Sequence, residues 1–404
     1  MIYDVIVIGA GASGCFASIH AGLLDKKVML IERNEKIGKK LYITGKGRCN
    51  ITNKSDPLNH LNNIINGKKF MNSASRVFTA DDTINFFESN GLVVKTERGN
   101  RVFPESDKSS DVIKVLEKEI KNSNVELKLN VKVESITKKE DKFIIKCNNK
   151  ENYTANCVII ATGGKSYSAT GSDGFGYTLA KNFGHTIIEP KPSLIPIILK
   201  DSVKDIEGLS LKNVTASVEI DGKKIVSEFG EMLFTDNGVS GPIILTISSK
   251  INRIDLTDAN LLIDFKPALN SEFLDKKLIN EFNDSPMKSL SNYLKTLLPN
   301  SFIDKFIKKA GLEDKKLSQI NKEERKIILT LLKRFDFSVK MLDNIDNAII
   351  TSGGVCLDEV NPKTMESKLV SGLYFAGEVL DIDALTGGYN LQVAFSTGYV
   401  AGNA

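Results

Sequence analysis

The sequence of 404 residues has few of the residues and patterns on which several common kinds of site depend. It contains no tryptophan and only three histidines. Its five cysteines are scattered, without CxxC or another spacing typical of metal ligands. We therefore expect no metal site. The odd number of cysteines is typical of a reducing compartment rather than of a disulfide-stabilised secreted protein.

Long apolar runs and a strong excess of one charge are also missing. No stretch reaches the roughly 20 apolar residues of a transmembrane helix. The apolar N-terminus is interrupted by glycines and lacks the basic segment of a signal peptide. The 54 basic and 50 acidic residues nearly cancel, so charge gives no sign of a nucleic-acid partner. We expect a cytoplasmic protein that binds neither membranes nor nucleic acid, and its oligomeric state stays open.

The first thirty-two residues predict a dinucleotide-binding unit of strand, helix and strand. Residues 3–8 form a short apolar run rich in β-branched residues, as in a buried strand, and 27–31 form a second one. Between them, Gly9, Gly11 and Gly14 make a GxGxxG pattern that opens a helix of small residues. Such glycines allow a tight turn, the approach of a pyrophosphate, and contact between helix and strand. The candidate binding residues here are Gly9, Gly11, Ala12, Ser13, Gly14 and Glu32, the last as an acceptor for ribose hydroxyls.

The next stretch, 33–50, has three glycines, several basic residues and few apolar ones, and so predicts a loop. Its position directly after the nucleotide-binding unit favours a loop along a phosphate-bearing cofactor over a solvated connection. Cys49 has no second cysteine close by, which favours a packing role over a redox thiol. The candidate residues of this loop are Arg33, Lys40, Thr44, Gly45, Gly47, Arg48, Cys49 and Asn50.

Beyond residue 50 the pattern changes several times. Helices are predicted over about 79–90 and 112–120, and antiparallel strands over 125–147. A buried strand over 157–160 ends at Ala161-Thr162-Gly163. Prolines at 190–196 indicate a hinge. Short alternating runs from 197 to 265 predict a small antiparallel or barrel-like unit, and 271–334 is helical and rich in lysine. We therefore divide the chain into 1–190 with 350–404, 191–268 with 335–349, and a helical insertion, 269–334.

Three motifs together resemble the two-dinucleotide-binding-domain flavoproteins: Gly9 to Gly14, Ala161-Thr162-Gly163, and Phe375-Ala376-Gly377-Glu378. Glu378 stands where that superfamily usually has aspartate. Longer motifs narrow the resemblance to the BaiN-like bacterial flavoproteins, also labelled the aminoacetone oxidase family. These motifs are Gly38-Lys39-Lys40, Gly47 to Asn53, Gly163 to Tyr167, Thr170-Gly171-Ser172, Gly353-Gly354-Val355 and Phe375 to Asp381. The resemblance covers nearly the whole chain.

The resemblance implies an α/β fold. A discontinuous Rossmann-like domain would bind FAD, with an inserted β-barrel-like unit and a small helical cap over the substrate face of the flavin. Val133 would hold the adenine through backbone groups, and Gly377 and Glu378 would lie beside the ribityl chain and pyrophosphate. The N-terminus of the last helix would stabilise negative charge near flavin N1 and O2 through Gly387, Gly388, Tyr389 and Asn390. Arg48, Cys49 and Asn50 are expected near the ring or the ribityl chain, and no catalytic residue is assigned.

The implied function is FAD-dependent oxidoreduction, with hydride passing between flavin N5 and a small organic substrate. Labels in the family range from amine oxidase to NAD(P)H-linked reduction of steroid double bonds. No second strand–GxGxxG–helix unit lies between 190 and 345. Either a reduced nicotinamide binds transiently over the flavin, or the substrate reduces the flavin and oxygen reoxidises it, releasing hydrogen peroxide. A flavin-dependent enzyme acting on RNA and a non-catalytic flavin-binding protein are further alternatives.

Overall fold

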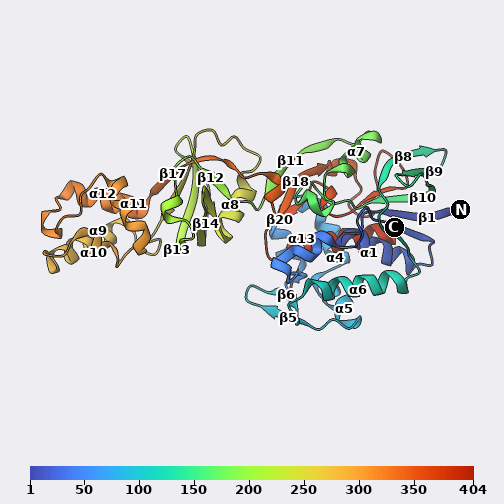
Figure 1. Cartoon of the computed structure of the whole chain (residues 1–404), viewed down its shortest axis with the longest axis horizontal. Helices are drawn as coiled ribbons and strands as arrows, with labels where there is room; N and C mark the ends of the chain where they lie inside the picture. The colour runs from blue at the N-terminus through green and yellow to red at the C-terminus, as the bar shows by residue number, and fades with distance from the viewer. The chain divides into compact units, whose positions relative to one another are not determined.

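The computed structural model describes all residues, 1–404, as two compact units. Unit 1 comprises residues 1–193 and 344–404, and unit 2 comprises residues 194–343. Both ends of the chain belong to unit 1, so Figure 1 shows its blue and red segments together. No helix is long and apolar enough to cross a membrane.

A seven-stranded sheet forms the centre of unit 1. Its order is β7 (Glu126–Lys128), β2 (Val28–Ile31), β1 (Ile2–Ile8), β10 (Asn152–Ile160), β9 (Lys142–Cys147) and β8 (Val133–Lys139), and β19 (Leu373–Phe375) also pairs with β10. The first half of β10 pairs antiparallel with β9, and its last three residues pair parallel with β19. The prediction of antiparallel strands throughout 125–147 is wrong for β7, which is parallel to β2. Alternation marks a half-buried strand but carries no information on the direction of its partner.

Two helices that are far apart in the sequence pack against each other through small residues. In α13 (Tyr389–Asn403), a Cβ atom at Gly398 would lie 2.4 Å from the Ser13 carbonyl oxygen of α1 (Ala12–Gly22), and one at Gly402 would lie 2.4 Å from the Ala17 carbonyl oxygen. The end of the chain is therefore held against its beginning. The predicted capping of α5 (Ala80–Ser89) by Thr79 and Asp82 is confirmed as a reciprocal capping box. The other helices of unit 1 are α2 (Lys39–Ile43), α3 (Pro57–Asn62), α4 (Lys68–Val77), α6 (Ser109–Asn122) and α7 (Phe175–Asn182).

Three small sheets complete unit 1. They are β3 (Thr52–Asn53) with β6 (Arg101–Pro104) and β5 (Val94–Glu97), β4 (Ile64–Asn66) with β20 (Asp383–Ala384), and β11 (Ile187–Ser193) with β18 (Ile350–Val355). Two sequence predictions need correction here. The segment 33–50 is not entirely a loop, because Ile37 and Leu41 are buried and α2 begins at Lys39. Pro190 and Pro192 lie inside β11, which tolerates them because it is an edge strand with a register shift between Ile188 and Lys191.

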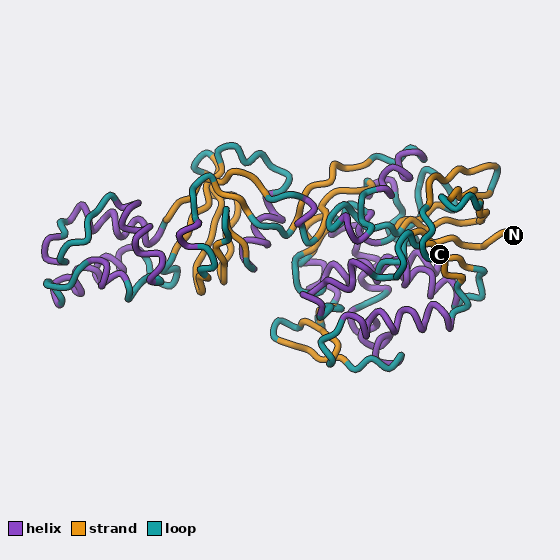
Figure 2. Tube along the Cα trace, in the orientation of Figure 1, coloured by secondary structure: helices purple, strands orange, loops and turns teal.

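Unit 2 contains a closed antiparallel barrel, where the alternating runs predict a small antiparallel or barrel-like unit. Its order is β12 (Ile197–Leu199), β15 (Gly238–Ser240), β14 (Lys223–Phe234), β13 (Ser210–Ile220), β16 (Ala259–Asp264) and β17 (Phe335–Leu342). Besides α8 (Pro242–Ile251), four helices belong to the same unit: α9 (Ser271–Asp284), α10 (Leu290–Leu294), α11 (Ile303–Ala310) and α12 (Lys322–Lys333). Phe302, just before α11, packs 5.0 Å from Phe335 of the barrel, ring centre to ring centre. Figure 2 shows the strand-rich and helical parts of this unit in orange and purple. The helix α8 (Pro242–Ile251) is an element that the sequence pattern did not reveal.

The predicted fold class is confirmed: a Rossmann-like α/β domain, an inserted antiparallel barrel, and a set of helices in the insertion.

Candidate functional site

A cavity of about 780 Å³ lies entirely among residues of unit 1. Its lining begins at the carboxyl ends of β1, β2 and β10, where ligands bind in open parallel sheets. We call this part of the lining the glycine-turn end; it consists of residues 8–13, 31–34 and 161–163. A second part, which we call the distal end, consists of residues 44–46, 48, 53, 99, 101, 103 and 386–390.

The three glycines of the first turn have different tasks. Gly9 has φ of 97°, and a Cβ atom at Gly14 would lie 1.8 Å from the Gly9 carbonyl oxygen. A Cβ atom at Gly11 would meet nothing within 4 Å. Gly14 thus allows the helix to touch the strand, whereas Gly11 leaves the backbone open beside the N-terminus of α1. Free N–H groups and the positive end of a helix dipole at this place suit a phosphate.

Glu32 is held by neutral donors and has no counter-ion. Its Oε2 atom accepts from the Ala10 N–H at 2.8 Å, and Oε1 accepts from the Asn34 N–H and Nδ2 at 2.9 and 2.7 Å. The residue is buried, with 8% of its surface exposed. Because a carboxylate has about four acceptor positions, one remains for a ligand hydroxyl. Arg33 forms an ion pair with Asp173, and Asn34 Nδ2 donates to the Thr170 carbonyl oxygen at 3.0 Å.

Lys40 and Glu378 form an ion pair between the two ends. The Lys40 Nζ atom lies 2.7 and 2.9 Å from the two Glu378 oxygens and 2.7 Å from Ser166 Oγ. These contacts use all three ammonium hydrogens. Glu378 Oε1 also accepts from the Thr351 N–H at 2.9 Å. Both residues therefore line the cavity, as predicted, but their charged groups bind each other.

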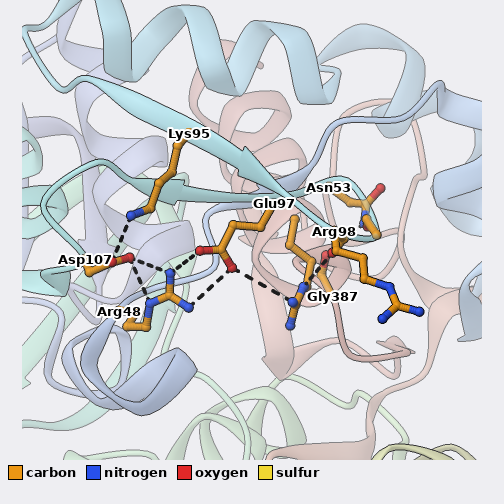
Figure 3. Close-up of polar contacts among 9 residues, drawn as sticks. Arg48, Asn53, Lys95, Glu97, Arg98, Asp107 and Gly387 are labelled. Carbon is orange, nitrogen blue, oxygen red and sulfur yellow. Dashed lines mark hydrogen bonds and ion pairs between the residues drawn. The ribbon is translucent and has the colours of Figure 1, made fainter. Parts of the chain in front are cut away.

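At the distal end, Arg48 is fixed by two carboxylates (Figure 3). Its Nε atom donates to Asp107 Oδ1 at 2.8 Å, and its guanidinium lies 4.2 Å from the centre of the Phe103 ring. Lys95 Nζ binds the other Asp107 oxygen at 2.8 Å. Hydrogen bonds from Lys95 and Arg48 hold the pKa of Asp107 below its ordinary value, and Arg48 does the same for the pKa of Glu97.

The Asn53 side chain connects two segments that are far apart in the sequence. Its Nδ2 atom donates to the Gly99 carbonyl oxygen at 2.9 Å and to the Gly387 carbonyl oxygen at 3.1 Å (Figure 3). The tip of the β5–β6 hairpin is thereby tied to the chain just before α13. Gly388 has φ of 99°, and a Cβ atom there would lie 2.3 Å from the Thr52 carbonyl carbon. The first N–H groups of α13 consequently lie beside the cavity.

Almost all sequence-predicted residues meet in this one cavity. All but four of them belong to the lining; Gly14, Gly47, Cys49 and Gly377 do not. Cys49 is fully buried, and burial raises the pKa of its thiol to about 12, which agrees with a packing role. A Cβ atom at Gly377 would lie 2.4 Å from Ser13 Oγ, so this glycine also serves close packing.

Several lining residues were not singled out from the sequence. Lys46 lies within the predicted loop 33–50, and Thr386 directly precedes the predicted residue Gly387, so position beside predicted residues was a usable signal. Ser172 belongs to the recognised motif Thr170-Gly171-Ser172, whereas Arg101 and Phe103 gave no comparable signal. The β5–β6 hairpin that carries Arg101 and Phe103 reaches the cavity only through tertiary contacts.

The residues present fit FAD. Asn50 Oδ1, Thr162 Oγ1 and Ser172 Oγ are buried side-chain atoms without a hydrogen-bond partner in the protein, and all three residues line the cavity. Unpartnered buried polar groups are costly, and a dinucleotide offers many hydroxyl, amide and phosphate groups to satisfy them. The open face at Gly11 and the remaining acceptor position of Glu32 suit a pyrophosphate and a ribose. The lining residues from Gly9 to Asn390 would together hold the cofactor.

Comparison with known proteins agrees with this geometry. The model of the HI0933-like protein Rossmann domain matches residues 3–404. The chain belongs to this family. It is 31% identical to a 3-dehydro-bile acid delta(4,6)-reductase from Clostridium scindens, over 98% of each chain. It is also 31% identical to a ribosomal RNA dihydrouridine synthase from Escherichia coli, over 98% of this chain and 96% of that protein.

The fold is shared with a solved structure of 3-ketosteroid delta1-dehydrogenase from Sterolibacterium denitrificans. The TM-score is 0.53 at 13% identity, and the match covers 100% of this chain and 99% of the other. The predicted membership of the BaiN-like flavoproteins is confirmed. The chain is an FAD-dependent oxidoreductase.

Proposed function

We propose that this enzyme reduces a carbon–carbon double bond conjugated to a carbonyl group in a small organic substrate. The observation that carries this proposal is what the two relatives have in common. One is named for reducing a delta(4,6) unsaturated 3-dehydro-bile acid, and the other for converting uridine to dihydrouridine. Both names describe hydrogen added to a double bond next to a carbonyl group.

The cavity suits this chemistry. When bound, FAD would supply the two electrons that the reduction requires. The N-terminus of α13, from Gly388 to Asn390, gives partial positive charge to the cavity wall, which favours negative charge developing there. The Asn390 side chain is not free for a ligand, because it donates to the Ala384 carbonyl oxygen at 2.8 Å and accepts from the Ala384 N–H at 2.9 Å. It thereby holds the helix start in place.

We also propose an electron donor, a set of cofactor contacts and a division into domains, none of which follows from family membership alone. A reduced nicotinamide would donate the electrons by transient binding at the distal end, since no second nucleotide-binding unit accompanies the first. The cofactor contacts would be those made by the cavity residues described above. The FAD-binding domain would correspond to 1–190 with 350–404, beside a barrel domain and a helical insertion.

The test is anaerobic mixing of the FAD-loaded enzyme with NADPH or NADH, followed by addition of a cyclic enone. Rapid bleaching of the flavin and its return on adding the enone would support the proposal. Bleaching by an amine instead, with hydrogen peroxide formed in air, would replace it with the amine oxidase alternative.

A second candidate is reduction of uridine in RNA, which the Escherichia coli relative's name favours. The near-neutral net charge of +4 argues for a small substrate instead. If the flavin colour returned with a uridine-containing RNA but not with enones, and if raised salt concentration abolished this return, RNA would be favoured as the substrate.

A further inference from the structure

The distal end of the cavity carries positive charge that is not balanced within the lining. Lys46, Arg48 and Arg101 line this end, and no acidic residue lines it. The three acidic residues of the lining lie elsewhere, at positions 32, 173 and 378, and the last two are paired with cations. The distribution of charge along the cavity is therefore uneven.

Arg48 is not free to bind a ligand anion. Its Nε and Nη2 atoms face Asp107 and Glu97, and hydrogen bonds to these carboxylates raise the pKa of the guanidinium further. Glu97 and Asp107 are thus largely occupied by Arg48 and Lys95 (Figure 3). Lys46 is left without a carboxylate partner, and Arg101 has only a long ion pair with Glu97.

Lys46 is exposed and makes no ion pair. Its φ and ψ angles are 58° and 41°, between two glycines that also have positive φ. A residue with a Cβ atom rarely adopts this conformation, and such backbone strain clusters at functional sites. The neighbouring Gly45 lies against Phe103, because a Cβ atom at Gly45 would be 3.6 Å from Phe103 Cε1.

Arg101 and Arg98 stand on the hairpin that faces this loop. Arg101 Nη2 lies 3.9 Å from Glu97 Oε2, too far for a hydrogen bond, and its Nε atom donates to the Arg98 carbonyl oxygen at 3.1 Å. The Arg101 guanidinium lies 5.8 Å from the centre of the same Phe103 ring. The Arg98 guanidinium is exposed and makes no hydrogen bond or ion pair; Arg98 lies outside the cavity lining, in the turn whose tip Asn53 fixes (Figure 3).

We propose that Lys46 and Arg101 of the lining, with Arg98 on the same hairpin just outside the lining, form a subsite for an anionic group, a phosphate or a carboxylate. The ligand would be the molecule that exchanges electrons with the bound FAD, so the inference rests on the proposed function. Guanidinium and ammonium groups that make no hydrogen bond to a carboxylate bind such anions through charge-assisted hydrogen bonds. The Asn53 contacts to Gly99 and Gly387 fix the hairpin in the position that the subsite needs.

The anion can come from either of two sources. A phosphorylated reduced nicotinamide carries a 2′-phosphate that its unphosphorylated counterpart lacks. A carboxylate-bearing enone carries a negative charge that its methyl ester lacks. Each pair of ligands differs only in the anionic group, so each isolates the subsite from the remaining contacts.

The experiment compares FAD-loaded Lys46→Gln, Arg98→Gln and the double variant Arg98→Gln/Arg101→Gln with the unchanged protein. Matched controls are Lys118→Gln and Arg76→Gln, which remove exposed cations of α6 and α4 outside the cavity lining. Binding of adenosine 2′,5′-bisphosphate and of succinate is measured by calorimetry and by the visible spectrum of the flavin. Stopped-flow experiments then measure the rate at which NADPH and NADH reduce the flavin and the rate at which each enone reoxidises it.

We expect each single variant to weaken binding of one anion probe about tenfold, and the double variant more, because each loses a charge-assisted contact. A loss confined to NADPH and the bisphosphate would identify the reductant's phosphate. A loss confined to the carboxylate enone and succinate would identify the substrate's carboxylate.

Equal changes for charged and neutral ligands, or changes no larger than those in the controls, would overturn the subsite. Probe binding does not require turnover. A protein that binds the probes normally but cannot be reduced would therefore disprove the proposed function and not the subsite.

Discussion

The two ends of the cavity in unit 1 are built in different ways. At the glycine-turn end, residues 8–13 and 31–34 come from one continuous strand–helix–strand unit, and the acidic side chain of Glu32 is satisfied by nearby backbone and amide donors. At the distal end, short segments from β3, the β5–β6 hairpin and the start of α13 are brought together from positions 53, 99 and 387.

The two ends therefore differ in how freely their residues can vary. The glycine-turn end has little freedom to vary, because its backbone segments touch directly and leave no room for side chains at Gly9 and Gly14. The distal end is formed by side chains on loops and a hairpin, and one of its cations, Lys46, has no ion-pair partner. Under the proposed function, cofactor binding would depend on backbone geometry, and selection of the second ligand on side chains that can change without altering the fold.

The largest effect is expected from Gly14→Val. The new side chain would collide with the Gly9 carbonyl oxygen, since even a Cβ atom would lie 1.8 Å away. We expect loss of more than about 3 kcal/mol of unfolding free energy and no FAD binding. Gly11→Ala is the matched control, because its Cβ atom meets nothing. Thermal unfolding of this variant should be nearly normal, whereas FAD titration should show weaker binding. Equal destabilisation by both changes would contradict the distinction between the two glycines.

Acidification should weaken unit 1 through His20 on α1. Burial among aromatic rings, including Tyr399 at 4.5 Å between ring centres, lowers the pKa of His20 from 6.5 to about 4. The folded state therefore favours neutral histidine, so its contribution is complete above pH 6.5 and is lost as the pH falls toward 4. The loss is about 3 kcal/mol.

Urea unfolding of the wild type and of His20→Phe from pH 7.5 to 4 measures this contribution. The variant should show a shallower decline between pH 6.5 and 4. An unchanged decline would assign the acid sensitivity to His60 or His185, whose pKa values burial also lowers.

A smaller effect is expected from Glu378→Gln, at the junction of the two ends. The change leaves the partly buried Lys40 ammonium without its carboxylate, and we expect a loss of about 2 kcal/mol of unfolding free energy with weaker FAD binding. Glu35→Gln breaks the more exposed Glu35–Lys39 pair and should leave both measurements unchanged. A similar loss in both variants would show that the contribution of the Lys40–Glu378 pair to stability and FAD binding does not depend on its position in the cavity.

The smallest effect is expected from Asn53→Ala, which releases the hairpin tip from the start of α13. Loss of two hydrogen bonds should cost about 1 kcal/mol globally. Amide hydrogen exchange should accelerate in residues 94–104 and stay unchanged in the strands of the large sheet. Asn122→Ala, on the exposed face of α6, provides the control. Uniform acceleration throughout unit 1 would mean that Asn53 acts on the whole unit and does not hold the hairpin.

The sequence by itself determined the elements that depend on local pattern. A buried strand, GxGxxG and a second strand predict the glycine-turn end because the turn, the helix start and Glu32 are neighbours in the chain. Thr79 with Asp82 predicts a helix start for the same reason. Alternation predicts the strands of the barrel, although its closure and the helix α8 come only from the structure.

Only the tertiary structure decided which distant segments share the distal end. Arg101 and Phe103 belong to a short hairpin without any motif, and Phe103 meets Gly45 and Arg48 because β6 pairs with β3. The pairing of Lys40 with Glu378 joins positions 338 residues apart. Whether a cation such as Arg48 is neutralised, or remains available as Lys46 does, depends on which carboxylates pack beside it. A local pattern cannot specify that, because such contacts form only when the chain has folded.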